Sequence, residues 1–312
     1  MSCNTFCGCG ELRTTGTPTR QAVIEDGTGV IFVPLVADDG TVNQILRSDV
    51  LNQAFFQAKV NDPDPSKRWY PIGNFTNVTN ERAESSFETF SDNSRARTLK
   101  GLRTFTGDLI GYAPNYASVI EAFRCYKMGV YKFDDCGKLI GLICLDSTDS
   151  QNDAFKPALI NEKSIDSLVM FLSDAATGKV RAQFDYSQLV KDAQFSLLTN
   201  DEMGGANMLN LIKLQPTKTV ISSQTATGFV ATITLDYGNW TAEPINGLVT
   251  TDFRLFNNTT QSVITITSAT ETGDGVYTFV IPSTTLTNSL TLTQASGTVK
   301  PFSVNKTFTL TV

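Results

Sequence analysis

Alternation of apolar and polar residues marks the segment RTLKGLRTFTGDLIG, which covers positions 97–111. In an extended chain, Phe105 and Leu109 fall on one side of this segment. Three polar residues fall on the other side: Thr104, Thr106 and Asp108. Because successive side chains of a strand point to opposite faces of a sheet, the pattern predicts a half-buried strand with one wet face.

Two segments further along the chain extend this β pattern. In 179–187, apolar residues alternate with polar and charged ones, which predicts a second strand with one wet face. The segment SLVMFLSD (167–174) is apolar at successive positions instead. A strand that is apolar on both faces is typical of a covered, central place in a sheet, and we expect that place here. The charged residues on the wet side of 179–187 are Lys179, Arg181 and Asp185.

A helical period follows Pro114, a residue that suits the first turn of a helix. Apolar residues between 116 and 126 recur at helical spacing, and Gly129 indicates where the helix ends. We expect this helix to pack on a sheet through Val119, Ile120 and Phe123. The apolar spacing of 41–60 predicts one broken helix or two short ones, with Ser48 as a cap.

Shorter runs predict the remaining strands and turns of this part of the chain. The runs 29–37 and 69–78 have strand character. The sequence DDCG (134–137) separates two apolar runs, and its glycine suits the positive φ that a hairpin turn needs. Asp134 and Asp135 have two interpretations, a metal or acid–base pair and ordinary turn chemistry, and we favour the second.

A charged stretch, 79–98, separates two predicted strands. Its acidic and basic residues are interspersed, which is typical of a solvated face or of a surface between subunits. A catalytic pair of carboxylates is the alternative, and an exposed hairpin or long loop is the interpretation we favour. The residues concerned are Glu81, Arg82, Glu84, Glu88, Asp92, Arg95 and Arg97.

The composition changes near Pro216. From 218 to 312, roughly a quarter of the residues are threonine, and no helical period is present. Short strand-like runs recur there, separated by turn signals, at the spacing of an immunoglobulin-like sandwich. Trp240 is either part of its core or a surface contact. We therefore expect an extended arm at 1–27, a β domain at 28–216 and the sandwich at 217–312.

Composition and charge exclude some classes of function, but they do not identify one. The 312 residues are 41% hydrophobic and 18% charged, which is ordinary for a globular protein. A net charge of −6 does not favour binding to nucleic acid through its phosphates. Histidine is absent, which excludes Ser–His and Cys–His nucleophiles and His-ligated metals. We find no catalytic constellation and predict no enzymatic activity and no cofactor.

Cysteines cluster at the start of the chain. Cys3, Cys7 and Cys9 could form a metal thiolate site, but the usual Cys-x2-Cys spacing is absent. We favour a reduced arm with incidental thiols and predict no metal. No apolar run is long enough to span a bilayer, and no secretion signal is visible, so we expect synthesis in the cytoplasm.

The middle of the chain resembles the tail tube proteins of long-tailed bacteriophages. The resemblance rests on WYPIGNFTNV, the acidic segment ESSFETFSDNSRAR, GLRTFTGDLIG, the short helix and GVYKFDDCGKLIG, in that order. It covers about 25–215. The last part of the chain is similar to the immunoglobulin-like domains added to virion proteins. This chain departs from the simplest members in its length and its cysteine-rich arm.

The resemblance implies a mainly β fold: a tail-tube-type β-sandwich or barrel with one or two packed helices, followed by an immunoglobulin-like sandwich. Such proteins form rings, usually hexameric, that stack into a tube through which genome DNA passes. On this basis Thr104, Thr106 and Asp108 would face the lumen, and 79–98 would join stacked rings. The implied partners are copies of itself and other tail proteins (tape measure, terminator and baseplate), and the implied location is the virion tail.

Three other functions stay open. One is another structural role in a virion, such as capsid decoration or a baseplate part. Another is a carbohydrate-binding adhesion module built on the threonine-rich domain. A glycosidase is the third, but it needs two carboxylates beside an aromatic groove, and the chain has only 2 tryptophans, far apart in sequence.

Overall fold

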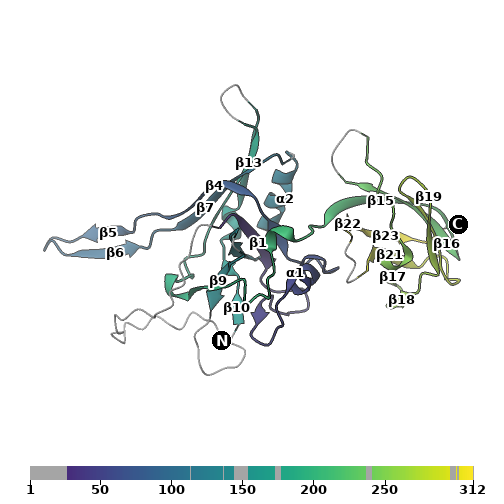
Figure 1. Ribbon diagram of the computed structural model, residues 1–312, viewed down its shortest axis with the longest axis horizontal. Coiled ribbons are helices and arrows are strands. Elements are labelled where there is room, and N and C mark those ends of the chain that lie inside the picture. Colours follow the sequence, from purple (N-terminus) through teal and green to yellow (C-terminus); the bar gives the residue numbers. More distant parts are fainter. Residues whose placement is uncertain are drawn as a thin grey trace. The chain divides into compact units, whose positions relative to one another are not determined.

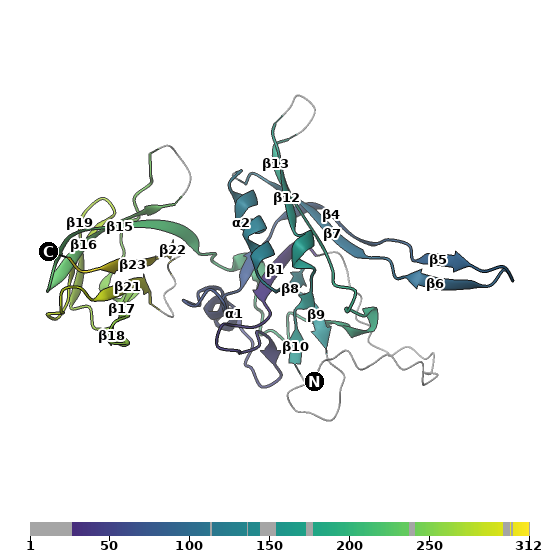
Figure 2. The ribbon, with the colours of Figure 1, turned by 180° about the vertical axis from the view of Figure 1, so that it is seen from behind.

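The computed structural model describes residues 27–112, 114–135, 137–143, 154–172, 177–236, 241–295, 300 and 302–311. It is mainly β, with 48% strand, two α-helices in the described part and several antiparallel sheets (Figures 1 and 2). The chain forms two compact units. The first contains Met1–Phe56 and Trp69–Leu211, and the second contains Gln57–Arg68 and Ile212–Val312. Most of the predicted arm, with Cys3, Cys7 and Cys9, lies outside the described residues, as do Cys136, Cys144 and Trp240.

The first unit contains an eight-stranded sheet with the order β2-β10-β9-β8-β1-β3, to which β11 adds beside β8 and β14 beside β9. Every residue of β1 and β8 is buried, as expected for strands that are covered on both faces. The bounds are β1 Gly29–Pro34, β2 Ile45–Leu46, β3 Tyr70–Ile72, β8 Met128–Phe133, β9 Leu139–Ile143, β10 Ala154–Lys156, β11 Ala158–Leu159 and β14 Phe195–Leu198.

A second, four-stranded sheet packs on the first, and we call it the open sheet. Its order is β12-β13-β7-β4, all antiparallel, with β12 Asp166–Met170, β13 Lys179–Asp185, β7 Arg103–Ile110 and β4 Phe75–Arg82. Phe105 and Phe184 stack on its inner side with ring centroids 4.9 Å apart, and Phe32 of β1 meets Phe184 edge-on at 5.5 Å. The inner side of the open sheet therefore shares one hydrophobic core with the larger sheet.

The alternation predicted for 179–187 is confirmed in β13. The single strand predicted for 97–111 is wrong in its first part, because 97–99 belong to β6 of the exposed hairpin, and the alternation holds only in β7, from Arg103 onward. Phe105 and Leu109 are fully buried, and in β13 buried positions alternate with half-buried ones. The place predicted for 167–174 is wrong. β12 is an edge strand, and Leu168 is 52% exposed while Phe171 is 78% exposed. Leu168 and Phe171 are left open to solvent, whereas Val169 is half-buried against the core of the first unit.

The helix predicted after Pro114 is present but shorter than expected. α2 spans Tyr116–Ala122, and a 3-10 turn, Phe123–Cys125, follows it. Ile120 and Phe123 are buried against the sheet core as predicted, whereas Val119 is 37% exposed, so its predicted packing is wrong. The helix packs through Ala117, Ile120 and Phe123, and Val119 lies about 100° around the helix from Ile120, at the margin of that face.

Two other segments differ from the predicted elements. The run 69–78 is not one strand: the chain breaks near Asn74, which has φ 63°, and passes from β3 in one sheet to β4 in the other. In 41–60, only α1 (Gln53–Val60) is helical, and Ser48 does not cap it. The Asn52 side chain accepts a hydrogen bond from the Phe55 N–H (2.9 Å) and takes that role.

Two turns agree with the sequence. The 134–137 turn links β8 and β9, with Gly137 at φ 76° and its N–H donating to the Asp134 carbonyl at 3.2 Å. The charged stretch forms an exposed hairpin of β5 (Ser86–Thr89) and β6 (Arg95–Leu99), as expected.

The second unit is built from two sheets, β19-β20-β16-β15-β22 and β18-β17-β21-β23. Aromatic and aliphatic side chains from both fill its core, with Phe229 stacked on Phe279 at 4.7 Å. One of the short strand-like runs, SVITITSA (262–269), is divided between β18 and β19, so the chain changes sheets within it. The bounds are β15 Gln215–Thr225, β16 Gly228–Leu235, β17 Phe253–Asn257, β18 Ser262–Ile264, β19 Ser268–Gly273, β20 Val276–Val280, β21 Ser289–Gln294, β22 Phe302–Ser303 and β23 Asn305–Thr309.

Candidate functional site

The outer side of the open sheet carries the residues predicted to be wet, and we call it the polar face. Thr104 and Thr106 are half-buried on it, in register with Asp185 and Gln183 of β13. The Thr104 hydroxyl donates to the Asp185 carboxylate at 2.6 Å. Asp108 also lies on this side of β7, but its side chain is only 1% exposed, so it is not the solvated carboxylate that the alternation suggested.

Two basic residues of β13 cover Asp108. The Lys179 Nζ lies 2.5 Å from Asp108 Oδ2, and the Arg181 Nε donates to Oδ1 at 2.8 Å. A second guanidinium nitrogen of Arg181 is 3.3 Å from Oδ2, so the guanidinium engages both carboxylate oxygens. Burial by itself raises the pKa of the Asp108 carboxyl, but the hydrogen bonds from Arg181, Lys179 and Asn77 outweigh it and hold the pKa well below the usual range.

A β-bulge in β4 supplies the third partner. The pairing of β4 with β7 shifts between Thr76 and Thr79, and Asn77 in between adopts φ 51°. This turns the Asn77 amide toward Asp108, and its Nδ2 donates to Oδ2 at 3.1 Å. The Thr76 hydroxyl donates to the Asp108 carbonyl at 3.1 Å. Asp108 is therefore held from both neighbouring strands of the open sheet.

The polar face ends in free strand edges. β12 pairs only with β13, and β4 pairs only with β7, among the residues that the structure describes (Figure 2). The free edge of β12 runs into Phe171 and Leu172, both 78% exposed. An exposed apolar edge offers unpaired N–H and C=O groups to any further strand, and monomeric sheet proteins usually protect such edges.

The hairpin β5–β6 projects away from the sheets of its unit, as Figure 1 shows. All residues of both strands are exposed, including Phe87 and Leu99. The Arg95 guanidinium lies over the Phe87 ring, 5.2 Å from its centroid. A two-stranded hairpin without a covered face is marginally stable in water, so this one gains from a surface to pack against.

The predicted stacking residues lie on or beside this hairpin. Glu88 and Asp92 belong to its first strand and its tip, where the Asp92 carboxylate accepts from the Ser94 N–H at 2.9 Å. Glu84 is exposed in the connection to β4. Glu81 instead lies opposite Thr104, on the polar face. Arg95 and Arg97 are exposed on the return strand β6.

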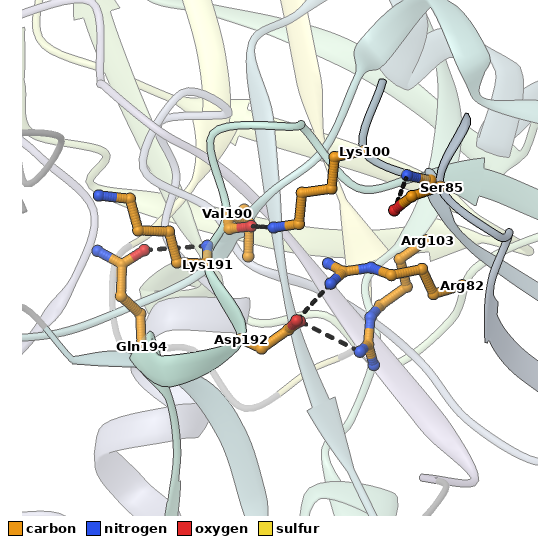
Figure 3. A network of polar contacts seen from close by, with 9 residues as sticks. Arg82, Ser85, Lys100, Arg103, Val190, Lys191, Asp192 and Gln194 are labelled. Carbon is orange, nitrogen blue, oxygen red and sulfur yellow. Dashed lines mark hydrogen bonds and ion pairs between the residues drawn. The ribbon is translucent and has the colours of Figure 1, made fainter. Parts of the chain in front are cut away.

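A cluster of charges braces the base of the hairpin, and we call it the arginine clamp: Arg82, Arg103 and Asp192 (Figure 3). Arg82, the last residue of β4, and Arg103, the first residue of β7, are cross-strand partners, and two like charges repel there. One carboxylate holds both, because Asp192 forms an ion pair with Arg82 and lies 3.2 Å from the nearest nitrogen of Arg103. The Arg103 guanidinium also lies 5.6 Å from the centroid of the Phe195 ring.

Gly101 allows the segment between β6 and β7 to approach the segment between β4 and β5 closely, just beyond the clamp. A Cβ at this position would lie 1.7 Å from the Ala83 carbonyl oxygen, so only glycine permits the approach. Beside it, the Lys100 Nζ lies 3.5 Å from the Val190 carbonyl (Figure 3). The segment that carries Val190 and Asp192 thus contacts the hairpin base at two points.

Sequence patterns located some of these residues and missed others. Alternation placed Lys179 and Arg181 on the wet side of β13, but it gave no sign that both reach Asp108. Asp192 was not singled out, because its partners lie 89 and 110 residues away. The described residues contain no cluster of three or more metal-ligating side chains. Their helices are also too short or too polar to cross a membrane.

A scan against models of known protein families finds no match, and a search of curated proteins finds no similar sequence.

Proposed function

We propose that this chain is a structural subunit that assembles with copies of itself into rings and stacked tubes, as the tail tube protein of a bacteriophage. The observation that carries the proposal is the open sheet, with its polar face and its two free edges. The apolar residues at the edge of β12 favour a partner strand over solvent.

The strand order favours a ring. Four antiparallel strands leave β12 and β4 running in opposite directions. When copies are placed side by side, β12 of one copy meets β4 of the next as an antiparallel neighbour, and the alternation continues unbroken. An interface of this head-to-tail kind closes into a ring when its rotation allows, and a closed barrel has no edges left.

Besides closed rings, a tube needs contacts between stacked rings and a lumen that lets DNA pass. The hairpin and the polar face supply these two. The hairpin offers an exposed aromatic and charged surface to an adjacent ring. The polar face would line the lumen, where its carboxylates disfavour the retention of DNA phosphates. In this proposal the first unit is the tail-tube-type sandwich, and the second is an added immunoglobulin-like sandwich. The protein has no enzymatic role, is made in the host cytoplasm and resides in the virion tail with other tail proteins.

Negative-stain electron microscopy of the purified full-length chain, over a series of concentrations, tests the proposal. We expect rings or hollow tubes with a stain-filled channel, and their fraction rises with concentration. Particles that stay monomeric at the highest concentration would overturn it. A glycan-binding assay on those particles would then separate an adhesion module from a decoration protein.

A further inference from the structure

Lys179 and Arg181 form a site that suits an anion. They are two residues apart on β13 and point to the same face, and their cationic groups converge on one point. An ammonium and a forked guanidinium around one small anion is an arrangement that also binds phosphate oxygens. Here the anion is the carboxylate of Asp108, from the same chain and the adjacent strand.

The carboxylate that occupies this site is buried and fixed by its neighbours. Asp108 is 1% exposed, whereas the side chains of Lys179 and Arg181 are 20% and 37% exposed. The bases therefore keep a route to solvent, and the acid does not. Asn77 and Thr76 of the β4 bulge hold Asp108 from the other side, through its carboxylate and its carbonyl.

We propose that Asp108 acts as an internal counterion that occupies a polyanion-binding pair and keeps the polar face from binding nucleic acid. The inference rests on the proposed function, in which this face lines a passage for DNA. Lys179 and Arg181 are the bases of β13 on this face, and without Asp108 they would bind phosphates and retain the passing strand. Carboxylates at Asp166, Asp185 and Glu81 add negative charge on the same face without contacting either base in the described structure.

The test compares two variants that remove the same charge from the same face. Asp108→Asn exposes the two bases, whereas Asp166→Asn removes an exposed carboxylate at the edge and leaves the Asp108 cluster intact. Binding of a short fluorescent DNA oligonucleotide is measured by anisotropy over a salt series. We expect Asp108→Asn alone to gain affinity, about tenfold or more at low salt. The slope of log K against the logarithm of the salt concentration should become more negative by about 1–2, because two bases become available to DNA phosphates.

The triple variant Asp108→Asn, Lys179→Gln, Arg181→Gln should return to the wild-type affinity. Equal binding by Asp108→Asn and Asp166→Asn, or a gain that survives in the triple variant, would overturn the proposal. If circular dichroism shows that Asp108→Asn does not fold, Thr106→Lys carries the same test, since it adds an unmasked base beside the cluster. Its control is Val220→Lys in the second unit, and no difference between the two would overturn the proposal.

Microscopy of the same samples separates this inference from the proposed function. If the affinity for DNA rises only in Asp108→Asn and the protein forms no tubes, the result supports the counterion role and overturns the proposed tube assembly. If tubes form and the affinity of Asp108→Asn for DNA does not rise, the result supports the proposed tube assembly and overturns the counterion role.

Discussion

Asp108 is a buried carboxylate on a sheet face that is otherwise open to water. Alternation alone places it with Thr104 and Thr106, and the structure confirms that all three point to the same face of β7. Its burial comes from two long basic side chains on the neighbouring strand, which fold over it. A buried charge costs free energy unless it is paired and hydrogen-bonded, and here three side chains meet that cost.

Replacing Asp108 with asparagine should lower the free energy of unfolding by about 1–3 kcal/mol, since charge-assisted bonds are lost while the bases can still reach water. Asp166→Asn, at an exposed position, should change it by no more than about 0.5 kcal/mol. Urea denaturation measures both. Equal effects of the two substitutions would contradict the assigned role of the ion-pair cluster.

The same residue predicts a pH dependence. The pKa of Asp108 is lowered by folding, so its contribution to stability is present above the unfolded value of about 4 and is lost as the pH falls below it. Between about pH 5 and pH 2, wild-type stability should therefore fall more steeply than that of Asp108→Asn. Urea midpoints over a pH series measure this, and parallel curves would contradict it.

At the scale of elements, the hairpin shows how a distant segment can stabilise a local one. The sequence of 79–98 predicts an exposed hairpin because charges of both signs are interspersed along it. The sequence of this segment does not predict what supports the foot of the hairpin, where it joins β4 and β7. That support comes from Asp192, which joins the two arginines where β4 ends and β7 begins.

Asp192→Asn should loosen the hairpin without unfolding the unit. The clamp is partly exposed, so its contribution is about 0.5–1 kcal/mol, and amide exchange in 86–99 should speed up by a few fold. Hydrogen exchange with mass spectrometry measures this, with Asp201→Asn in an exposed turn as the control. Unchanged exchange in the hairpin, or equal acceleration in β1 and β8, would rule out a local clamp.

At the scale of the whole molecule, the unexpected position of β12 matters most for function. Its run of apolar residues predicted a covered central strand, and the structure places it at an edge. A strand of another copy beside β12 would give it the central place in a sheet that the pattern predicted, as the proposed ring requires.

A charge on that edge should block assembly. Leu168→Lys puts a lysine on the exposed edge strand, which is a common natural protection against strand pairing. Val220→Lys is the matched control, because the two side chains are 52% and 51% exposed and Val220 lies on β15 of the second unit, outside the open sheet. We expect size-exclusion chromatography to show only monomers for Leu168→Lys and wild-type oligomers for Val220→Lys. Oligomers of wild-type size in both would exclude the β12 edge as the interface.

The local pattern determined the strands β7 and β13, the exposed hairpin and the approximate place of α2, because side-chain periodicity is a property of neighbouring residues. Tertiary structure decided the rest. The break at Asn74, the edge position of β12, the pairing of Asp108 with Lys179 and Arg181, and the reach of Asp192 all depend on which strands lie side by side. Strand order brings together residues that are far apart in the chain, and no short-range pattern encodes it.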